Sequence, residues 1–163
     1  MKVLTVNAGS SSTKVAVVEE GIALDSLALP CAGDPSIEPA LAHLIDRFKP
    51  QASGHRIVHG GARYTSPLLV NDESEAGLSE LAVLAPLHNP PALSLIDVVR
   101  ALDPTMPLVA CFDTTFFASL PASSATYAIP AEWRERWGIR RFGFHGLSHS
   151  WAVSRGRIGW PHC

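Results

Sequence analysis

The sequence predicts an α/β domain built on a mixed β-sheet with flanking helices. Two short apolar runs rich in β-branched residues, 2–6 and 13–18, are long enough for buried strands and too short for helices. Further apolar runs follow, and segments with helical spacing of their apolar residues lie between them. The chain has 163 residues, of which 47% are apolar and 17% charged, so one domain with a proper core is expected.

The elements after the first strand pair are predicted from periodicity and punctuation. Ser36 is expected to cap a helix that carries apolar residues along one face up to Phe48. Asn89 followed by Pro90 is a helix start signal, and Gly138 is a helix stop signal. The expected strands are 22–29, 55–61, 107–113 and 124–129, and the expected helices are 36–48, 74–84, 89–102 and 130–138.

Composition excludes several classes of function. A formal net charge of −2 gives no basic field, so nucleic acid is not an expected partner. The N-terminus lacks the apolar core of a signal peptide, and no apolar run approaches a membrane span. Cys31, Cys111 and Cys163 lack metal-ligand spacing and are expected to be reduced thiols. These features predict a cytoplasmic protein without a membrane partner.

The turn between the first two strands is a candidate phosphate site. Asn7, Gly9, Ser10 and Ser12 place a glycine free to take positive φ among short polar side chains. Backbone N–H groups in such a turn can form an anion-binding concavity, and Lys14 adds a cation. The alternative is an ordinary hairpin turn made of common turn-forming residues.

The strand near residue 56 suggests a carboxylate site. Arg56 and Val58 share one face of that strand, so the guanidinium could grip both oxygens of a small acid while Val58 faces its alkyl end. The alternative for Arg56 is an ordinary surface ion pair. His55 and His59 have the i, i+4 spacing of a helical zinc site, but they lie on a predicted strand, so a metal site is not expected there.

Two more candidates stand at the ends of predicted elements. Leu87 and His88 lie on a loop before a helix, a place suited to positioning a substrate or to a purely structural role. Asp113 ends an apolar strand, and ligands of open α/β sheets gather at such ends. Asp113 is therefore placed for metal binding, for a base or for orienting an arginine, and its alternative is a helix cap.

The loop 141–149 carries two glycines, two histidines and two aromatic residues. Glycines on both sides of Phe144 and His145 permit close approach of the backbone, and a histidine held there could donate to a developing phosphoryl charge. Zinc binding by His145 and His149 would need a third ligand that the sequence does not identify. The alternative is a loop histidine without a catalytic role.

Five motifs occur together in this sequence: Val6–Ser12, His55–Gly61, Leu84–Pro91, Phe112–Thr114 and Phe142–His149. Together they closely resemble acetate kinase, and they stand in family order between Met1 and about Trp151. The resemblance implies the actin–hexokinase–Hsp70 superfamily, with its ribonuclease H-like mixed sheet and two-domain cleft.

The resemblance implies transfer of a phosphoryl group from ATP, with Mg²⁺, to acetate, giving acetyl phosphate. It also implies a cytoplasmic homodimer without nucleic-acid or membrane partners. Propionate or butyrate is the alternative acyl substrate. The implied roles are phosphate and metal binding for Asn7, phosphate binding for Gly9, Ser10, Ser12 and Lys14, carboxylate binding for Arg56, a methyl pocket from Val58, Leu87 and Phe144, positioning for Asp113, and phosphoryl stabilisation for His145.

The resemblance ends near Trp151, where family members continue a helix. Two glycines and a proline follow in residues 152–163, which we interpret as an aberrant tail from a frameshift or truncation after a domain of residues 1–151. Without the second, nucleotide-binding domain of the family, we expect the fragment to be inactive alone. The alternatives are a non-catalytic carboxylate- or phosphate-binding fragment, or a chain complemented by a separately encoded second half.

Overall fold

The protein folds around one mixed sheet of six strands in the order β3-β2-β1-β4-β6-β5. The computed structural model describes the backbone of residues 1–159 and the side chains of residues 1–156. Strands β1, β2 and β3 form an antiparallel meander, β4 and β6 run parallel to β1, and β5 pairs antiparallel to β6. The bounds are β1 Lys2–Ala8, β2 Thr13–Glu19, β3 Ile22–Leu29, β4 Ala52–Ile57, β5 Leu68–Leu69 and β6 Leu108–Phe112.

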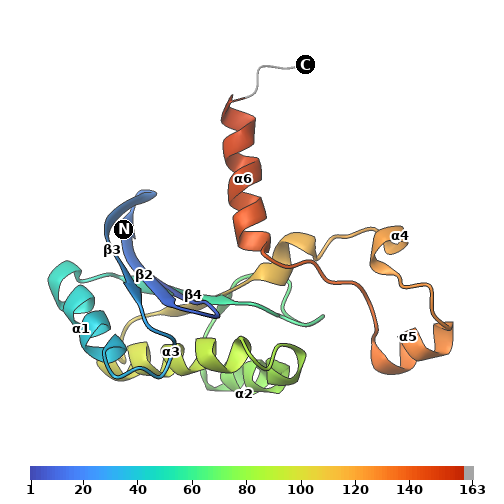
Figure 1. Cartoon of the computed structure of the whole chain (residues 1–163), viewed down its shortest axis with the longest axis horizontal. Coiled ribbons are helices and arrows are strands. Elements are labelled where there is room, and N and C mark those ends of the chain that lie inside the picture. Colours follow the sequence, from blue (N-terminus) through green and yellow to red (C-terminus); the bar gives the residue numbers. More distant parts are fainter. Residues whose placement is uncertain (160–163) are drawn as a thin grey trace.

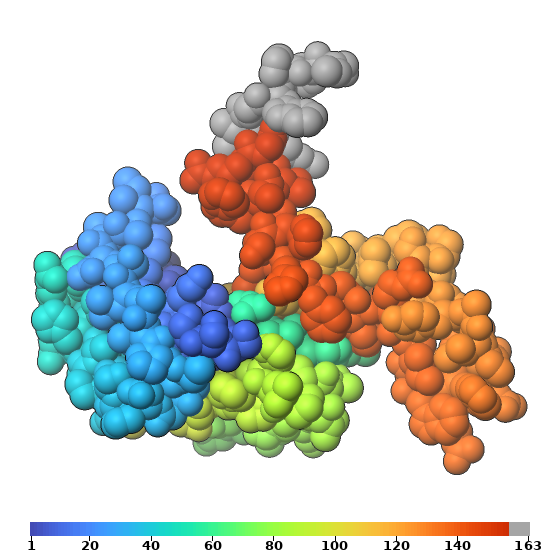
Figure 2. All heavy atoms as spheres, viewed as in Figure 1, coloured from blue at the N-terminus to red at the C-terminus, as the bar shows by residue number. Residues whose placement is uncertain are grey.

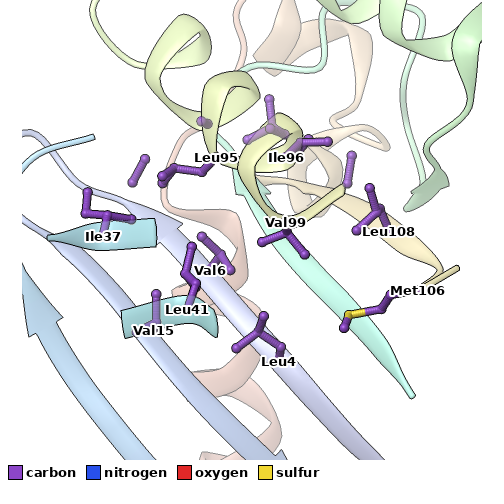
Figure 3. Close-up of a cluster of buried hydrophobic side chains, with 14 of the residues drawn as sticks. Leu4, Val6, Val15, Ile37, Leu41, Leu95, Ile96, Val99, Met106 and Leu108 are labelled. Carbon is purple, nitrogen blue, oxygen red and sulfur yellow. The ribbon is translucent and has the colours of Figure 1, made fainter. Parts of the chain in front are cut away.

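Helices cover one face of this sheet and leave the other open (Figure 1). Helices α1 (Ile37–Phe48) and α3 (Asn89–Leu102) pack on the buried side chains of β1, β2, β4 and β6, and α2 (Asp72–Glu80) packs beside α3. Figure 3 shows that contact layer, in which Leu4, Val6 and Val15 of the strands meet Leu41 of α1 and Val99 of α3. Alternation along each strand sends every second side chain to this layer, so the residues between them face the open side.

The chain after β6 leaves the sheet. A 3₁₀ turn, η2 (Asp113–Phe117), is followed by α4 (Ala122–Ala125) and α5 (Ala131–Trp137), which form an arm at one side of the molecule (Figure 1). Helix α6 (Gly146–Gly159) then projects from η2 above the open face of the sheet. Figure 2 shows the hollow that separates α6 from the N-terminal strands.

Most predicted elements are confirmed, with specific corrections. The strand predicted at 124–129 is wrong: the segment holds the end of α4 and an irregular stretch. The helix predicted at 74–84 is α2 followed by a 3₁₀ turn, η1 (Leu81–Leu84). The two-residue strand β5 was not predicted.

Two predicted helix caps have a different role in the structure. Ser36 makes no cap bond, and instead both its backbone N–H and its hydroxyl donate to Asp34. Asn89 is the first residue of α3 rather than its cap, and its side chain is used in tertiary hydrogen bonds. The Ser36 side chain is used by a local partner two residues away and the Asn89 side chain by tertiary partners, and either kind of contact competes with capping.

The C-terminal segment is helical as far as Gly159, although glycines at 156 and 159 weaken a helix. The proposed boundary at residue 151 stays a prediction, and residues 160–163 of the proposed tail lie outside the described residues. Among the described residues, no helix combines the length and the apolar character needed to cross a membrane.

Candidate active site

Strand register gathers the predicted site residues on the open face of the sheet. Asn7 of β1 pairs with Lys14 of β2, so both side chains leave the same face. The parallel register of β1 with β4 and of β4 with β6 sets Arg56 beside Cys111, with Asn7 on the other flank. Asp113 follows Cys111 by two residues and therefore continues the same face at the end of β6.

Arg56 is the centre of a buried hydrogen-bond network. Its Nε and Nη2 donate to Asp113 Oδ2 at 3.0 and 2.6 Å, and its Nη1 donates to Asn7 Oδ1 at 3.1 Å. The Arg56 side chain is 19% exposed and that of Asp113 is 1% exposed, so this is no surface ion pair. The Asp113 side chain makes no helix-cap bond. It instead accepts the hydrogen bonds of Arg56 and so orients the guanidinium.

The turn of residues 8–12 is closed by its own backbone. Gly9 N–H donates to the Ser12 carbonyl at 2.9 Å. The expectation of a positive φ at Gly9 is wrong; glycine is needed there because a Cβ would lie 2.8 Å from the Ser12 carbonyl oxygen. Ser10 and Lys14 are exposed and Ser12 is half-buried, so their polar groups are open to a ligand.

Two hollows meet at this network. The larger, of about 1040 Å³, lies between the strands and α6 and includes Asn7, Gly9, Ser10, Ser12, Lys14, Arg56 and His145 in its lining. The smaller, of about 470 Å³, includes Arg56, Val58, Leu87, Asp113, Phe144 and His145. Arg56, His88 and His145 line both, so a polar trough and an apolar hollow share one border. Every predicted site residue thus lies on one of the two.

His145 is held in an unusual backbone conformation at the start of α6. Its φ is +56°, in the left-handed region that disfavours a side chain. The next residue must be glycine, because a Cβ on Gly146 would lie 1.9 Å from the Asp113 carbonyl oxygen. This close approach fixes His145 beside Asp113, at the border between the two hollows.

Two histidines, His55 in β4 and His59 just after it, are buried. His55 Nε2 lies 2.9 Å from Ser53 Oγ, and burial lowers the pKa of His55 to about 4. Burial also lowers the pKa of His59, whose Nδ1 accepts the Gly61 N–H at 2.9 Å. Neither histidine belongs to a metal cluster, since no group of three or more His, Cys, Asp or Glu side chains suited to a metal occurs in the described part of the chain.

The sequence predicts that His88, with Leu87, lies on a loop suited to positioning a substrate or to a purely structural role, and in the structure His88 lines both hollows. Sequence reasoning missed the role of Asn89, which is 1% exposed and bonded to the backbone of His59. The position of His88 directly after Leu87, before a proline-led helix, is the signal that pointed to this loop. No sequence signal joins Asn89 to His59, 30 residues away.

The residues fit a magnesium ion that is shared with phosphate. Mg²⁺ is usually held by one or two protein oxygens together with phosphate oxygens and water. Asn7 Oδ1 lies on the trough, and Asp113 Oδ1 is a buried oxygen without a hydrogen-bond partner. Asn7 and Asp113 are therefore the residues whose side-chain oxygens would hold such an ion.

Comparison with known proteins agrees with this geometry. The sequence model of the acetokinase family matches residues 36–157. An acetate kinase from Corynebacterium jeikeium (strain K411) is 50% identical over 104 residues, which are 64% of this chain and 26% of that protein. The chain therefore spans about a quarter of the length of that relative.

Two solved structures share the fold. A propionate kinase from Francisella tularensis subsp. tularensis SCHU S4 superposes with a TM-score of 0.83 at 28% identity, over 94% of this chain and 47% of that one. An acetate kinase from Porphyromonas gingivalis gives 0.80 at 30% identity, over 98% of this chain and 49% of that one. The predicted mixed α/β architecture is thus confirmed, and this chain belongs to the acetokinase family.

Proposed function

We propose that the chain binds a short-chain carboxylate and a phosphoryl group side by side, as the acceptor site of an acetate or propionate kinase. The observation that carries this proposal is the position of Arg56 at the border between the polar trough and the apolar hollow. A carboxylate held there has its oxygens toward the trough and its alkyl end in the hollow. The proposed reaction is ATP + acetate to ADP + acetyl phosphate.

The Arg56 guanidinium is pre-organised for this task. A guanidinium has five N–H bonds, and the contacts to Asp113 and Asn7 occupy Nε–H and one N–H on each terminal nitrogen. One N–H on each terminal nitrogen is not used by these contacts, and two such donors can grip both oxygens of a carboxylate. Asp113 and Asn7 act as positioning residues because they fix the plane of the guanidinium.

The apolar hollow sets the size of the acid. Val58, Leu87 and Phe144 wall it, and Leu87 is 80% and Phe144 43% exposed, so its mouth is wide. A methylene in such a pocket changes binding by about 1–3 kcal/mol. We therefore propose acetate and propionate as substrates, with butyrate the weaker alternative.

The trough supplies positions for the phosphoryl group. The transition state of phosphoryl transfer is loose and anionic, so it needs positioned donors and cations more than covalent chemistry. Ser10, Ser12 and Lys14 offer donors around the turn, and His145 offers one at the border. When bound, Mg²⁺ supplies positive charge to the phosphate oxygens, and Asn7 is the residue proposed to hold it.

The test has a binding arm and a turnover arm. Sodium [¹³C]acetate titrated into the purified chain should bind, and Arg56→Ala should weaken that binding at least about tenfold, as expected for loss of a charged bidentate contact. ATP consumption with acetate is expected to be low for these 163 residues alone and to rise when the C-terminal half of a family member is co-expressed. Absence of Arg56-dependent acetate binding, with folded spectra, would contradict the proposal.

A non-catalytic role is the second candidate. In the described part of the chain, α6 contributes Leu147, Ser148, Trp151 and Ala152 to the lining of the polar trough, and these side chains are exposed, so water reaches the trough. Water in the site screens the charges that favour transfer. Acetate binding without turnover in either condition would favour a carboxylate-binding module over a kinase.

A further inference from the structure

Two buried polar residues, His59 and Asn89, lie behind the apolar hollow without lining it. Their exposed fractions are 5% and 1%. Val58, Leu87 and Phe144, which wall the hollow, come from three segments far apart in sequence. Each of these segments is attached to the His59–Asn89 pair.

Asn89 holds both backbone polar groups of His59. Its Oδ1 accepts the His59 N–H at 3.2 Å, and its Nδ2 donates to the His59 carbonyl at 3.0 Å and to the Leu81 carbonyl at 3.3 Å. One side chain therefore joins the exit of β4, the turn η1 and the start of α3. If these three bonds broke, the Asn89 amide and its backbone partners would be buried without hydrogen bonds, which costs free energy. The bonds therefore hold the three segments in a fixed arrangement.

The His59 ring extends the same attachment to the third segment. Its centroid lies 4.6 Å from that of Phe142 and 5.5 Å from that of Phe144, both in edge-to-face arrangements. Its Nδ1 accepts the Gly61 N–H at 2.9 Å, which fixes the ring orientation and puts the proton on Nε2. The ring is thus a rigid support beneath Phe144 rather than a mobile side chain.

We propose that this pair, the His59–Asn89 clamp, is a positioning device that sets the width of the apolar hollow and hence its preference for acids of two or three carbons. Val58 precedes His59 directly, and Leu87 precedes Asn89 by two residues, so the clamp fixes the distance between two walls. Its ring supports the third wall. The inference rests on the proposed function for the identity of the ligand, but not for the geometry of the walls.

The test compares Asn89→Ala and Asn89→Asp with a matched control, Asn71→Ala. Asn71 caps α2 through hydrogen bonds with Ser74 and lies on an exposed surface away from both hollows. Its loss destabilises a helix start without touching the clamp. Beside two buried carbonyl oxygens the carboxyl group of Asn89→Asp is expected to stay protonated, so it keeps the acceptor for the His59 N–H and can donate to only one of the two carbonyls. It therefore loses less of the clamp than Asn89→Ala and stays informative if Asn89→Ala does not fold.

The first readout needs no ligand. The methyl resonances of Val58 and Leu87, recorded by NMR, should shift in both Asn89 variants and stay in place in Asn71→Ala. Amide exchange of His59 should accelerate in Asn89→Ala, which loses the acceptor of the His59 N–H, and should stay slow in Asn71→Ala. Unchanged Val58 and Leu87 methyl positions in a folded Asn89 variant would overturn the inference, whatever the chain binds.

The second readout uses sodium acetate, propionate and butyrate as probes. The wild-type preference for acetate over butyrate should fall about tenfold or more in the Asn89 variants, the size of effect expected for one or two methylenes. An unchanged preference would overturn the inference about the His59–Asn89 clamp and leave the proposed function standing. Carboxylate binding that does not depend on Arg56 would instead contradict the proposed function, while the ligand-free readout still decides on the clamp.

Discussion

At the scale of single residues, the Arg56–Asp113 contact joins stability to the candidate site. Asp113 lies at the end of β6, where it is buried and accepts two hydrogen bonds from one guanidinium. Removing only one partner of a buried pair leaves a charge without compensation, which costs more than the net value of the pair. Substitutions here are therefore expected to affect folding as well as binding.

Arg56→Ala should lower the free energy of unfolding by about 3–5 kcal/mol, the usual cost of an uncompensated buried charge. Urea denaturation followed by circular dichroism measures this loss. Arg56→Ala combined with Asp113→Asn should recover part of it, because no charge is then left buried. Asp46→Ala, which breaks an exposed pair with Lys49, is the control and should change little. Equal effects of the single and double variants would contradict this account.

The residues of the candidate site differ in how far sequence predicts them. Asn7, Arg56 and Asp113 stand at strand ends or beside a turn, and strand alternation with sheet register then brings them together. Asn89 could not be predicted, because an asparagine before a proline has the local pattern of a helix cap. Its partner His59 is chosen by tertiary packing, which has no local signature.

At the scale of elements, α6 depends on close approach of its first residue to η2. A Cβ on Gly146 would lie 1.9 Å from the Asp113 carbonyl oxygen and 2.7 Å from Phe116 Cβ. The same helix contains Gly156, around which a Cβ would meet nothing within 4 Å. One helix thus offers a forbidden and a permitted glycine substitution.

Gly146→Ala should detach the start of α6 and destabilise the protein by at least about 1–3 kcal/mol, as overpacking does. Gly156→Ala should instead stabilise the helix by about 1 kcal/mol, since glycine is a poor helix former. Amide exchange along α6 and thermal unfolding measure both. Matching effects of the two substitutions would show that contact with η2 does not hold the helix.

Long periodic elements were predictable and short ones were not. The strands β1 and β2 and the helices α1 and α3 follow from apolar spacing, because each buries a full face. The strand β5 has two residues, too few for a period. The segment 124–129 has strand-like composition, but it pairs with no strand of the described residues 1–159 and lies on the arm away from the sheet.

At the scale of the whole molecule, a buried histidine makes stability depend on pH. The pKa of His55 is lowered from 6.5 to about 4 because the ring is desolvated in the core. The unfolded chain therefore binds a proton at a higher pH than the folded chain, and stability falls as pH drops from 6.5 towards 4. Above pH 6.5 the contribution of His55 is complete.

Protonation of His55 should lower the free energy of unfolding by about 1.4 kcal/mol for each pH unit between pH 6.5 and pH 4. Denaturation midpoints measured between pH 7 and pH 4 test the slope. His55→Gln, which cannot take up the proton, should flatten the curve, whereas replacing the exposed His43 with glutamine should leave it steep. Parallel curves for the wild type and His55→Gln would contradict the assignment.

The strand order has a further consequence for how the protein is assembled in time. Strands β1 to β3 are neighbours in the sequence, whereas β4 pairs with β1 and β6 across long intervening segments. Local pairings close early and distant pairings close late, because long loops cost more entropy. The serine-rich turn should therefore exist before Arg56 finds Asp113 and Asn7. The folding chain would pass through an intermediate in which the serine-rich turn has formed and the hydrogen bonds of Arg56 have not. Pulse-labelled amide exchange should therefore show protection of β1 and β2 before that of β4 and β6.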